Sequence, residues 1–170
     1  MAIRPILHYP DPRLRQKARP VEQVTPAIRQ LIQDLAETMY AAPGVGLAAP
    51  QLGEPHRVFV VDAAAEDEPS ALHTFVNPEI VAREGTSTYR EGCLSFPGIA
   101  EEIERAARVT VRALDAEGRP FELTAEGLLA TAIQHENDHL DGQLMIDHLG
   151  MLKRRVVHRE MLKAKREAEG

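Results

Sequence analysis

Tryptophan is absent from this chain, cysteine occurs once, and aromatic residues make up only 4% of its 170 positions. A single cysteine excludes a disulfide within the chain. Because hydrophobic residues make up 44% of the sequence and few of them are aromatic, we expect a mostly aliphatic core. The length is sufficient to bury such a core, and we predict one domain over residues 1–170.

Positive charge is also scarce, since 20 lysine and arginine residues face 26 acidic ones and the net charge is −6. This balance argues against a domain that binds DNA or RNA as a whole. No apolar run approaches the roughly 20 residues of a membrane span. The first residues, 1–5, lack the basic and apolar blocks of a signal peptide. We therefore expect a cytoplasmic protein that binds neither membranes nor DNA.

The predicted elements favour an α+β fold in one compact domain. Thr25 and Pro26 form a typical helix start, and apolar residues follow at helical spacing to about Ala42. Asn77 and Pro78 fall inside a predicted strand, which indicates an edge strand or a bulge. We predict strands over 57–62, 73–84, 108–114 and 120–123, a short extended piece over 143–146, and helices over 125–140 and 151–169. Mostly antiparallel or mixed sheets should surround the second of the three helices.

That helix carries the pattern H-E-x-x-H at residues 135–139. Four residues are slightly more than one helical turn, so His135 and His139 face the same way and can bind one metal ion. Glu136 lies near the same rim, where it can reach a water molecule without being a ligand. Two solvated histidines on a surface helix are the alternative, but residues 128–133 are mostly apolar and indicate a buried helix. Buried polar groups need a partner, and a metal ion is the simplest one.

A catalytic site of this kind usually has three protein ligands, and the third is not obvious. Downstream candidates fit poorly because they follow too closely or belong to another element; they are Asp141, Asp147, His148 and His158. Cys93 is the better candidate, since it lies in a turn flanked by glycine and beside Glu91. A lone cysteine is more often a small buried apolar residue, but this context, in a chain whose H-E-x-x-H helix lacks a third ligand, argues against that interpretation of Cys93.

A second segment of interest is Gly44–Gln51, which interrupts the first helix with small residues. A phosphate loop would need a strand before it and a helix after it, and here the order is reversed. We therefore expect a backbone that lies close to a ligand, with Gln51 as an amide donor. A turn into a strand with a solvated glutamine is the alternative.

Three segments together resemble the signature motifs of the peptide deformylase family. They are Gly44–Gln51 (GVGLAAPQ), Glu91–Ser95 (EGCLS) and Gln134–His139 (QHENDH), in the order and at about the spacing of that family. The resemblance extends from about Ile6 to the last helix. It implies an enzyme that removes the N-formyl group from the N-terminal methionine of newly synthesised proteins and releases formate.

The resemblance also implies the ligands of the metal. In this sequence, Cys93, His135 and His139 would bind one divalent ion, with water in the fourth position. Iron(II) is typical of the family, and zinc, nickel and cobalt are also accepted. A site with one thiolate and two imidazoles suits both iron(II) and zinc, so the residues themselves leave the metal open.

The remaining roles follow from the same resemblance. Glu136 would deprotonate the attacking water and then protonate the leaving amine. The Gln51 side-chain amide and the Leu94 backbone N–H would stabilise the oxyanion. The methionine side chain needs a pocket, and the candidates share the helix face of His135 or lie in the glycine-rich segment; they are Leu128, Thr131, Ala132, Val45 and Gly46. An ordinary core role for these residues is the alternative.

One feature departs from the family, in which an arginine often follows the cysteine motif and helps to hold the peptide. Residues 96–102 contain none. Arg105 is the nearest arginine, and we predict that it pairs with Glu91.

Three other functions remain open. The first is a metallopeptidase with broader substrates, which would also use H-E-x-x-H. The second is a non-catalytic metal-binding protein, and the presence of Glu136 argues against it, because a purely structural site needs no base. The third is a copper electron carrier, which usually has a weak axial methionine ligand; the methionine nearest to these motifs in the sequence is Met145.

The last helix is basic, with seven lysine or arginine residues against three glutamates in residues 153–170, and could dock the chain on the ribosome. A solvated charged face is the simpler interpretation of that helix.

Overall fold

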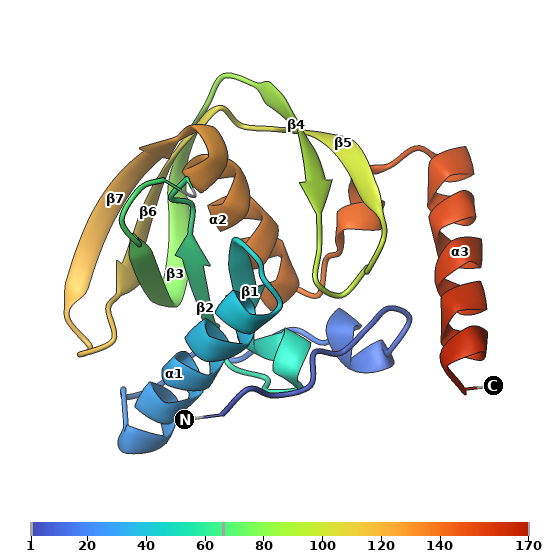
Figure 1. Cartoon of the computed structure of the whole chain (residues 1–170). Coiled ribbons are helices and arrows are strands. Elements are labelled where there is room, and N and C mark those ends of the chain that lie inside the picture. The colour runs from blue at the N-terminus through green and yellow to red at the C-terminus, as the bar shows by residue number, and fades with distance from the viewer. Residues whose placement is uncertain (1, 66, 170) are drawn as a thin grey trace.

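The computed structural model describes residues 2–65 and 67–169 (Figure 1). Its elements, in chain order, are the 3-10 turn η1 (Pro12–Arg15), α1 (Pro26–Ala41), β1 (Gly46–Ala48), η2 (Ala49–Leu52), β2 (Val58–Asp62), β3 (Leu72–Glu84), β4 (Ser87–Gly92), β5 (Ala100–Arg105), β6 (Arg108–Leu114), β7 (Pro120–Glu126), α2 (Gly127–Leu140), η3 (Met145–His148) and α3 (Met151–Glu169). This confirms the predicted α+β class.

The main sheet has five strands in the order β1-β2-β3-β6-β7, and every neighbouring pair is antiparallel. Its two faces are covered by different helices. Val58 and Val60 of β2 pack in one apolar cluster with residues of α1, whereas Phe59 and Val61 pack in another with residues of α2. Successive side chains of a strand point to opposite faces of the sheet. Because both faces are covered at β2, all five of its residues are buried. Helix α2 therefore lies against the sheet for most of its length (Figure 1).

Helix α1 forms where the sequence predicts it. The Thr25 side chain accepts a hydrogen bond from the Ile28 N–H at 3.3 Å, and Pro26 occupies the first helical position. The buried apolar residues of α1 are Ile28, Leu31, Ile32, Leu35 and Met39. This helix supports the sheet and carries no candidate site residue.

Helix α2 begins two residues later than predicted. Ala125 and Glu126 are still paired with Val109 and Arg108 in the β6–β7 ladder, and the helix starts at Gly127, which has a φ of +62°. The chain therefore passes from the last strand of the sheet directly into α2. This short connection sets where α2 crosses the sheet, and hence where its histidines lie.

Strand β3 is a central strand, because it pairs with β2 on one side and β6 on the other. The bulge predicted around Asn77 and Pro78 is confirmed by a register shift between Val76 and Glu79, so the edge-strand alternative is wrong. Asn77 has a φ of +52°, and its side chain bonds both the N–H and the C=O of Val21. The bulge thus anchors the segment that precedes α1.

The hairpin of β4 and β5 is absent from our sequence-based prediction. Six of its twelve residues are charged, including the inward-facing Glu91 and Arg105, so no apolar alternation marks the strands. This hairpin carries the cysteine motif in the turn that joins its strands. The piece predicted as extended over 143–146 is also different, since Met145–His148 forms a 3-10 turn.

Helix α3 agrees with its predicted bounds of 151–169. It stands at the side of the molecule in Figure 1, near the β4–β5 hairpin and the N-terminal segment. Val157 and Met161 are its buried residues, and they belong to a third apolar cluster that also contains Phe96 and Ile103. Within the described part of the chain, no helix has both the length and the apolar character that a membrane span needs.

The end of α2 depends on a glycine. Gly142 has a φ of +73°, and a Cβ atom at this position would lie 2.3 Å from the Arg15 carbonyl oxygen. We expect Gly142→Ala to lower the free energy of unfolding by roughly 3 kcal/mol or more, because both the backbone conformation and the contact are unfavourable. Gly98→Ala is the matched control, since Gly98 has a φ of +80° with open space around it, and it should cost only about 1 kcal/mol. Urea denaturation measures both, and equal losses would contradict the steric argument.

Candidate metal centre

Two elements far apart in the chain bring the three predicted ligands together. His135 and His139 come from the buried face of α2 and are 7% and 1% exposed. Cys93 comes from the turn after β4. The ligand atoms of these three residues all lie within 4.8 Å of one another. The predicted convergence of the cysteine motif and the H-E-x-x-H helix is therefore present in the fold.

The donor atoms fit a single transition-metal ion. The Cys93 sulfur and the His139 Nε2 atom are 3.4 Å apart. In a tetrahedral site with metal–sulfur bonds of about 2.3 Å and metal–nitrogen bonds of about 2.0 Å, the two atoms would lie roughly 3.5 Å apart. One thiolate and two imidazoles also form a donor set that such ions prefer. These residues can therefore hold a metal ion.

A buried carboxylate orients one of the histidines. Glu91 is 6% exposed, and its Oε1 atom lies 3.0 Å from Nδ1 of His135. This contact leaves Nε2 of His135 for the centre, which is how a carboxylate usually supports a metal-binding imidazole. Because Glu91 stands two residues before Cys93, the same short segment supplies one ligand and orients another.

Glu91 is in turn held by Arg105, as predicted from the sequence. The guanidinium donates two hydrogen bonds to the Glu91 carboxylate, at 2.6 and 3.0 Å, and a third to Asp138 at 2.9 Å. His148 contacts the same Asp138 oxygen at 2.8 Å. Our prediction gave Asp138 no role and considered His148 only as a poor candidate for the third metal ligand. The position of Asp138 on α2, directly before His139, is the feature of the sequence that could have indicated its place in the network.

Burial and charge set the protonation of these groups. Burial would raise the pKa of Glu91, but hydrogen bonds from His135 and Arg105 bring it below its ordinary value. Burial, together with the neighbouring His135, lowers the pKa of His139 well below its usual range, so this ring is neutral. A neutral imidazole is the form that binds a metal.

His135 shows the opposite shift. Burial would lower its pKa, but the adjacent charges of Cys93 and Glu136 raise it well above the ordinary value. These negative groups favour a positive charge between them. The same field favours a metal cation at that place.

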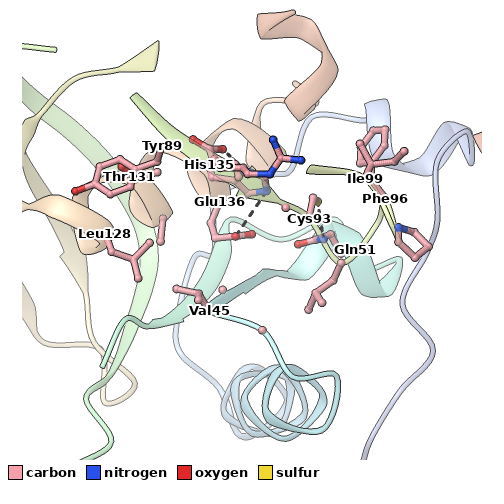
Figure 2. A pocket seen from close by; sticks show the side chains of 18 of the residues that line it. Val45, Gln51, Tyr89, Cys93, Phe96, Ile99, Leu128, Thr131, His135 and Glu136 are labelled. Carbon is pink, nitrogen blue, oxygen red and sulfur yellow. Dashed lines mark hydrogen bonds and ion pairs between the residues drawn. The ribbon is translucent and has the colours of Figure 1, made fainter. Parts of the chain in front are cut away.

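Glu136 lies beside the cluster and faces the cavity (Figure 2). It is 4% exposed, and burial raises its pKa to about 7. Its Oε1 atom has no hydrogen-bond partner within the described residues. A buried carboxylate oxygen without a partner is uncommon and points to a group that it meets during function. Gly46 permits this position, because a Cβ atom there would lie 2.6 Å from Oε2 of Glu136.

Gln51 is a fixed donor, so the alternative of a solvated glutamine is wrong. The residue is 1% exposed, and its side-chain oxygen accepts a hydrogen bond from the Ala48 N–H at 2.9 Å. Its Nε2 atom lies 3.0 Å from Ser95 Oγ and 3.8 Å from the Cys93 sulfur. The amide nitrogen is thus directed at the cluster.

A cavity of about 450 Å³ opens onto these residues (Figure 2). All five predicted pocket residues line it, together with Leu94: they are Val45, Gly46, Leu128, Thr131 and Ala132. Val45 and Leu128 are 38% and 44% exposed, as expected for residues at the mouth and not for an ordinary core. Tyr89, Phe96 and Ile99 also line the cavity and were not predicted, because they belong to the hairpin and its turn.

A buried H-E-x-x-H helix, a cysteine from a second element and a buried carboxylate beside an apolar cavity are the parts of a mononuclear metallohydrolase site. The family model for polypeptide deformylase matches residues 3–155. The chain belongs to this family, as the resemblance of its three motifs predicts.

Individual relatives agree over nearly the whole chain. A peptide deformylase of Alkalilimnicola ehrlichii is 54% identical over 167 residues, which are 98% of this chain and 93% of the relative. The crystal structure of a peptide deformylase from Legionella pneumophila superposes with a TM-score of 0.92 at 48% identity and covers 99% of this chain and 98% of its own. The peptide deformylase of Ehrlichia chaffeensis in complex with actinonin gives a TM-score of 0.93 at 36% identity, with 98% and 99% covered.

The buried network makes a prediction for Arg105, whose side chain is 4% exposed. Arg105→Ala leaves the Glu91 charge buried without its guanidinium partner, so we expect a loss of about 3–5 kcal/mol in unfolding free energy. Because Glu91 then no longer orients His135 firmly, metal affinity should fall about 10–100-fold. Arg112→Ala is the control, since its pair with Glu122 is exposed and 3.6 Å long. Calorimetry and a metal titration test this, and unchanged stability and affinity would contradict it.

Proposed function

We propose that this chain, as one catalytic domain over residues 1–170, removes the N-formyl group from the N-terminal methionine of newly synthesised polypeptides in the cytoplasm and releases formate. The observation that carries the proposal is the buried Oε1 atom of Glu136, which has no hydrogen-bond partner among the described residues and belongs to a side chain that lines the cavity beside the Cys93–His135–His139 cluster. Membership of the deformylase family supplies the substrate class.

We propose that Cys93, His135 and His139 hold one divalent metal ion, with iron(II) as the native metal and zinc, nickel or cobalt as functional substitutes. When bound there, such an ion supplies Lewis acidity, which lowers the pKa of water and polarises a carbonyl group. The donor set supports iron(II) and zinc alike, and the family resemblance favours iron(II).

Glu136 is the proton-transfer group of the proposed reaction. With a pKa of about 7, its side chain takes up and gives back a proton at neutral pH with little cost in either direction. Glu136 accepts a proton from the water that attacks the formyl carbon. It then returns this proton to the methionine nitrogen as the C–N bond breaks, which leaves formate and a free amine.

Two donors face the negative charge that develops on the formyl oxygen. The Gln51 amide is held by Ala48 and Ser95, so it needs little reorganisation during the reaction. The backbone N–H of Leu94, in the same turn as Cys93, is the second donor. Fixed dipoles of this kind typically lower the barrier more than mobile solvent does.

The cavity fits an extended peptide with an apolar first side chain. The methionine side chain would occupy the space beside Leu128, Thr131 and Ala132, all of which line the cavity. Strand β1 is an edge strand of the main sheet and β4 belongs to a two-stranded sheet, and residues of both line the same cavity. Such edges can pair with the backbone of a bound peptide, so Val45 and Gly46 are well placed to hold it.

The test of the reaction is formate release from a formyl-Met peptide by protein purified without oxygen. Glu136→Ala should lower kcat by on the order of 10²–10⁴-fold while the metal content stays the same, because the proton-transfer group is lost and the ligands are not. Exposed Glu122 provides the control Glu122→Ala, with no expected change. Cleavage of unformylated peptides by the wild type would favour a broader metallopeptidase, and inactivity of the metal-loaded wild type would refute the proposal.

The assignment of the pocket makes a separate prediction. Ala132 is 7% exposed and lines the cavity, so the indole of Ala132→Trp should occupy the space of the methionine side chain. We expect KM for formyl-Met peptides to rise by about tenfold or more, with little change in metal content. Ala164→Trp, on the exposed side of α3, should leave both quantities unchanged. Equal losses of metal and of substrate binding in Ala132→Trp would contradict the assignment.

We further propose that α3 docks the enzyme on the ribosome. Arg155, Arg159 and Lys163 are exposed and have no ion-pair partner among the described residues, as expected for contacts with phosphates. Met151, Leu152 and Val156 are exposed apolar residues on the same helix, at 70%, 77% and 54%. Charge and apolar surface together favour a macromolecular partner.

Removal of α3 would also remove Val157 and Met161 from the core, so charge reversal is the sharper test of docking. The triple variant Arg155→Glu, Arg159→Glu and Lys163→Glu should lose co-sedimentation with ribosomes at low salt and keep its activity on short peptides. Reversal of Arg83, Arg108 and Arg112, on β3 and β6, is the control for net charge. Unchanged co-sedimentation of the α3 variant would contradict docking.

A further inference from the structure

The N-terminal segment around Leu7 and Tyr9 is tied to both sides of the proposed oxyanion site. The Leu7 N–H donates to the Gln51 carbonyl at 2.7 Å, and the Tyr9 N–H donates to the Ser95 carbonyl at 2.9 Å. Ser95 in turn accepts the Gln51 amide through its hydroxyl group. One short segment therefore fastens the backbones that carry Gln51 and the Cys93 turn.

The Tyr9 ring adds a second connection to the turn. It stacks on Phe96 with ring centroids 5.0 Å apart and an interplanar angle of 21°. Phe96 is fully buried, lines the catalytic cavity, and donates its N–H to the Cys93 carbonyl at 2.9 Å. The position of the Tyr9 ring is therefore transmitted to the turn that contains the Leu94 N–H.

Helix α3 holds Tyr9 from the other side. The Tyr9 hydroxyl forms a hydrogen bond with Nδ1 of His158, and the two rings meet edge to face with centroids 5.4 Å apart. His158 follows Val157, which is one of the two residues that anchor α3 in the core. A continuous set of contacts thus runs from α3 through Tyr9 to Phe96 and the Cys93 turn.

We propose that Tyr9, locked by His158, is a positioning residue for deformylation: it sets the place of the Cys93–Phe96 turn and so aims the donors at the developing oxyanion. The proposal rests on the proposed function. Donors that act mainly on the transition state affect kcat more than KM when they are displaced. Loss of the Tyr9–His158 lock should therefore slow turnover and leave substrate binding nearly unchanged.

Four variants of the full, metal-loaded chain test this. Tyr9→Phe and His158→Ala each remove the same hydrogen bond, and each should lower kcat about threefold to tenfold with KM within about twofold, the range of one hydrogen bond. The double variant should be no slower than the slower single variant, because both act through one contact. Tyr9→Leu also loses the stacking on Phe96 and should be slower than Tyr9→Phe.

Tyr40→Phe is the matched control. Its hydroxyl donates to Asp62 at 2.6 Å, away from the cavity, so this variant should lose stability and keep its kcat. An equal fall of kcat in Tyr40→Phe, an unchanged kcat in a folded Tyr9→Leu, or additive effects in the double variant would each overturn the proposal.

A readout that does not depend on activity separates this proposal from the proposed function. In cobalt(II)-loaded protein, absorption from the Cys93 thiolate to the metal reports the position of the turn. This absorption should shift in Tyr9→Leu and stay unchanged in Tyr40→Phe. If the wild type releases no formate, the proposed function fails, and the cobalt spectra still decide on Tyr9: a shift supports its positioning role and an unchanged spectrum refutes it.

Discussion

Glu91 joins the metal-binding helix to the hairpin that carries Cys93, and the geometry of the centre depends on this buried contact. A carboxylate that is 6% exposed is tolerated only because Arg105 and His135 both bond to it. Arg105 is itself held by Asp138 of α2. The charges therefore form one closed set that fastens β4 and β5 to α2. Since Cys93 follows Glu91 by two residues, this set also fixes its distance from the two histidines.

Burial away from water shifts the pKa values of two groups at the centre, Glu136 and His139. The same burial raises the pKa of Glu136 to about 7 and keeps His139 neutral. One group is thereby suited to proton transfer and the other to metal binding. Close approach of the Gly46 backbone helps to enclose Glu136, since any side chain at this position would meet the carboxylate. The small residue at position 46 therefore affects both the shape of the cavity and the burial of the Glu136 carboxylate.

Sequence reasoning succeeded where the signal was local and periodic. Thr25 with Pro26 marked the start of α1, and the bounds of α3 agree with the structure. The hairpin of β4 and β5 was missed because its inward-facing residues include Glu91 and Arg105 instead of apolar ones. Tyr89, Phe96 and Ile99 were missed as cavity residues for the same reason. The buried polar residues that break the apolar alternation of β4 and β5 also orient the metal centre. The strands that sequence reasoning missed are therefore those that carry part of the functional site.

The sequence by itself determined which atoms are available for chemistry. Helical periodicity alone places His135 and His139 on one face with Glu136 beside them, because that relation is set within one turn of backbone. Only the tertiary structure decided that the Cys93 sulfur lies 3.4 Å from His139, that Oε1 of Glu136 has no hydrogen-bond partner among the described residues, and that Tyr9 packs on Phe96. These relations join residues far apart in the chain. They arise from the packing of helices and sheets around shared cores, and the local sequence pattern carries no information on that packing.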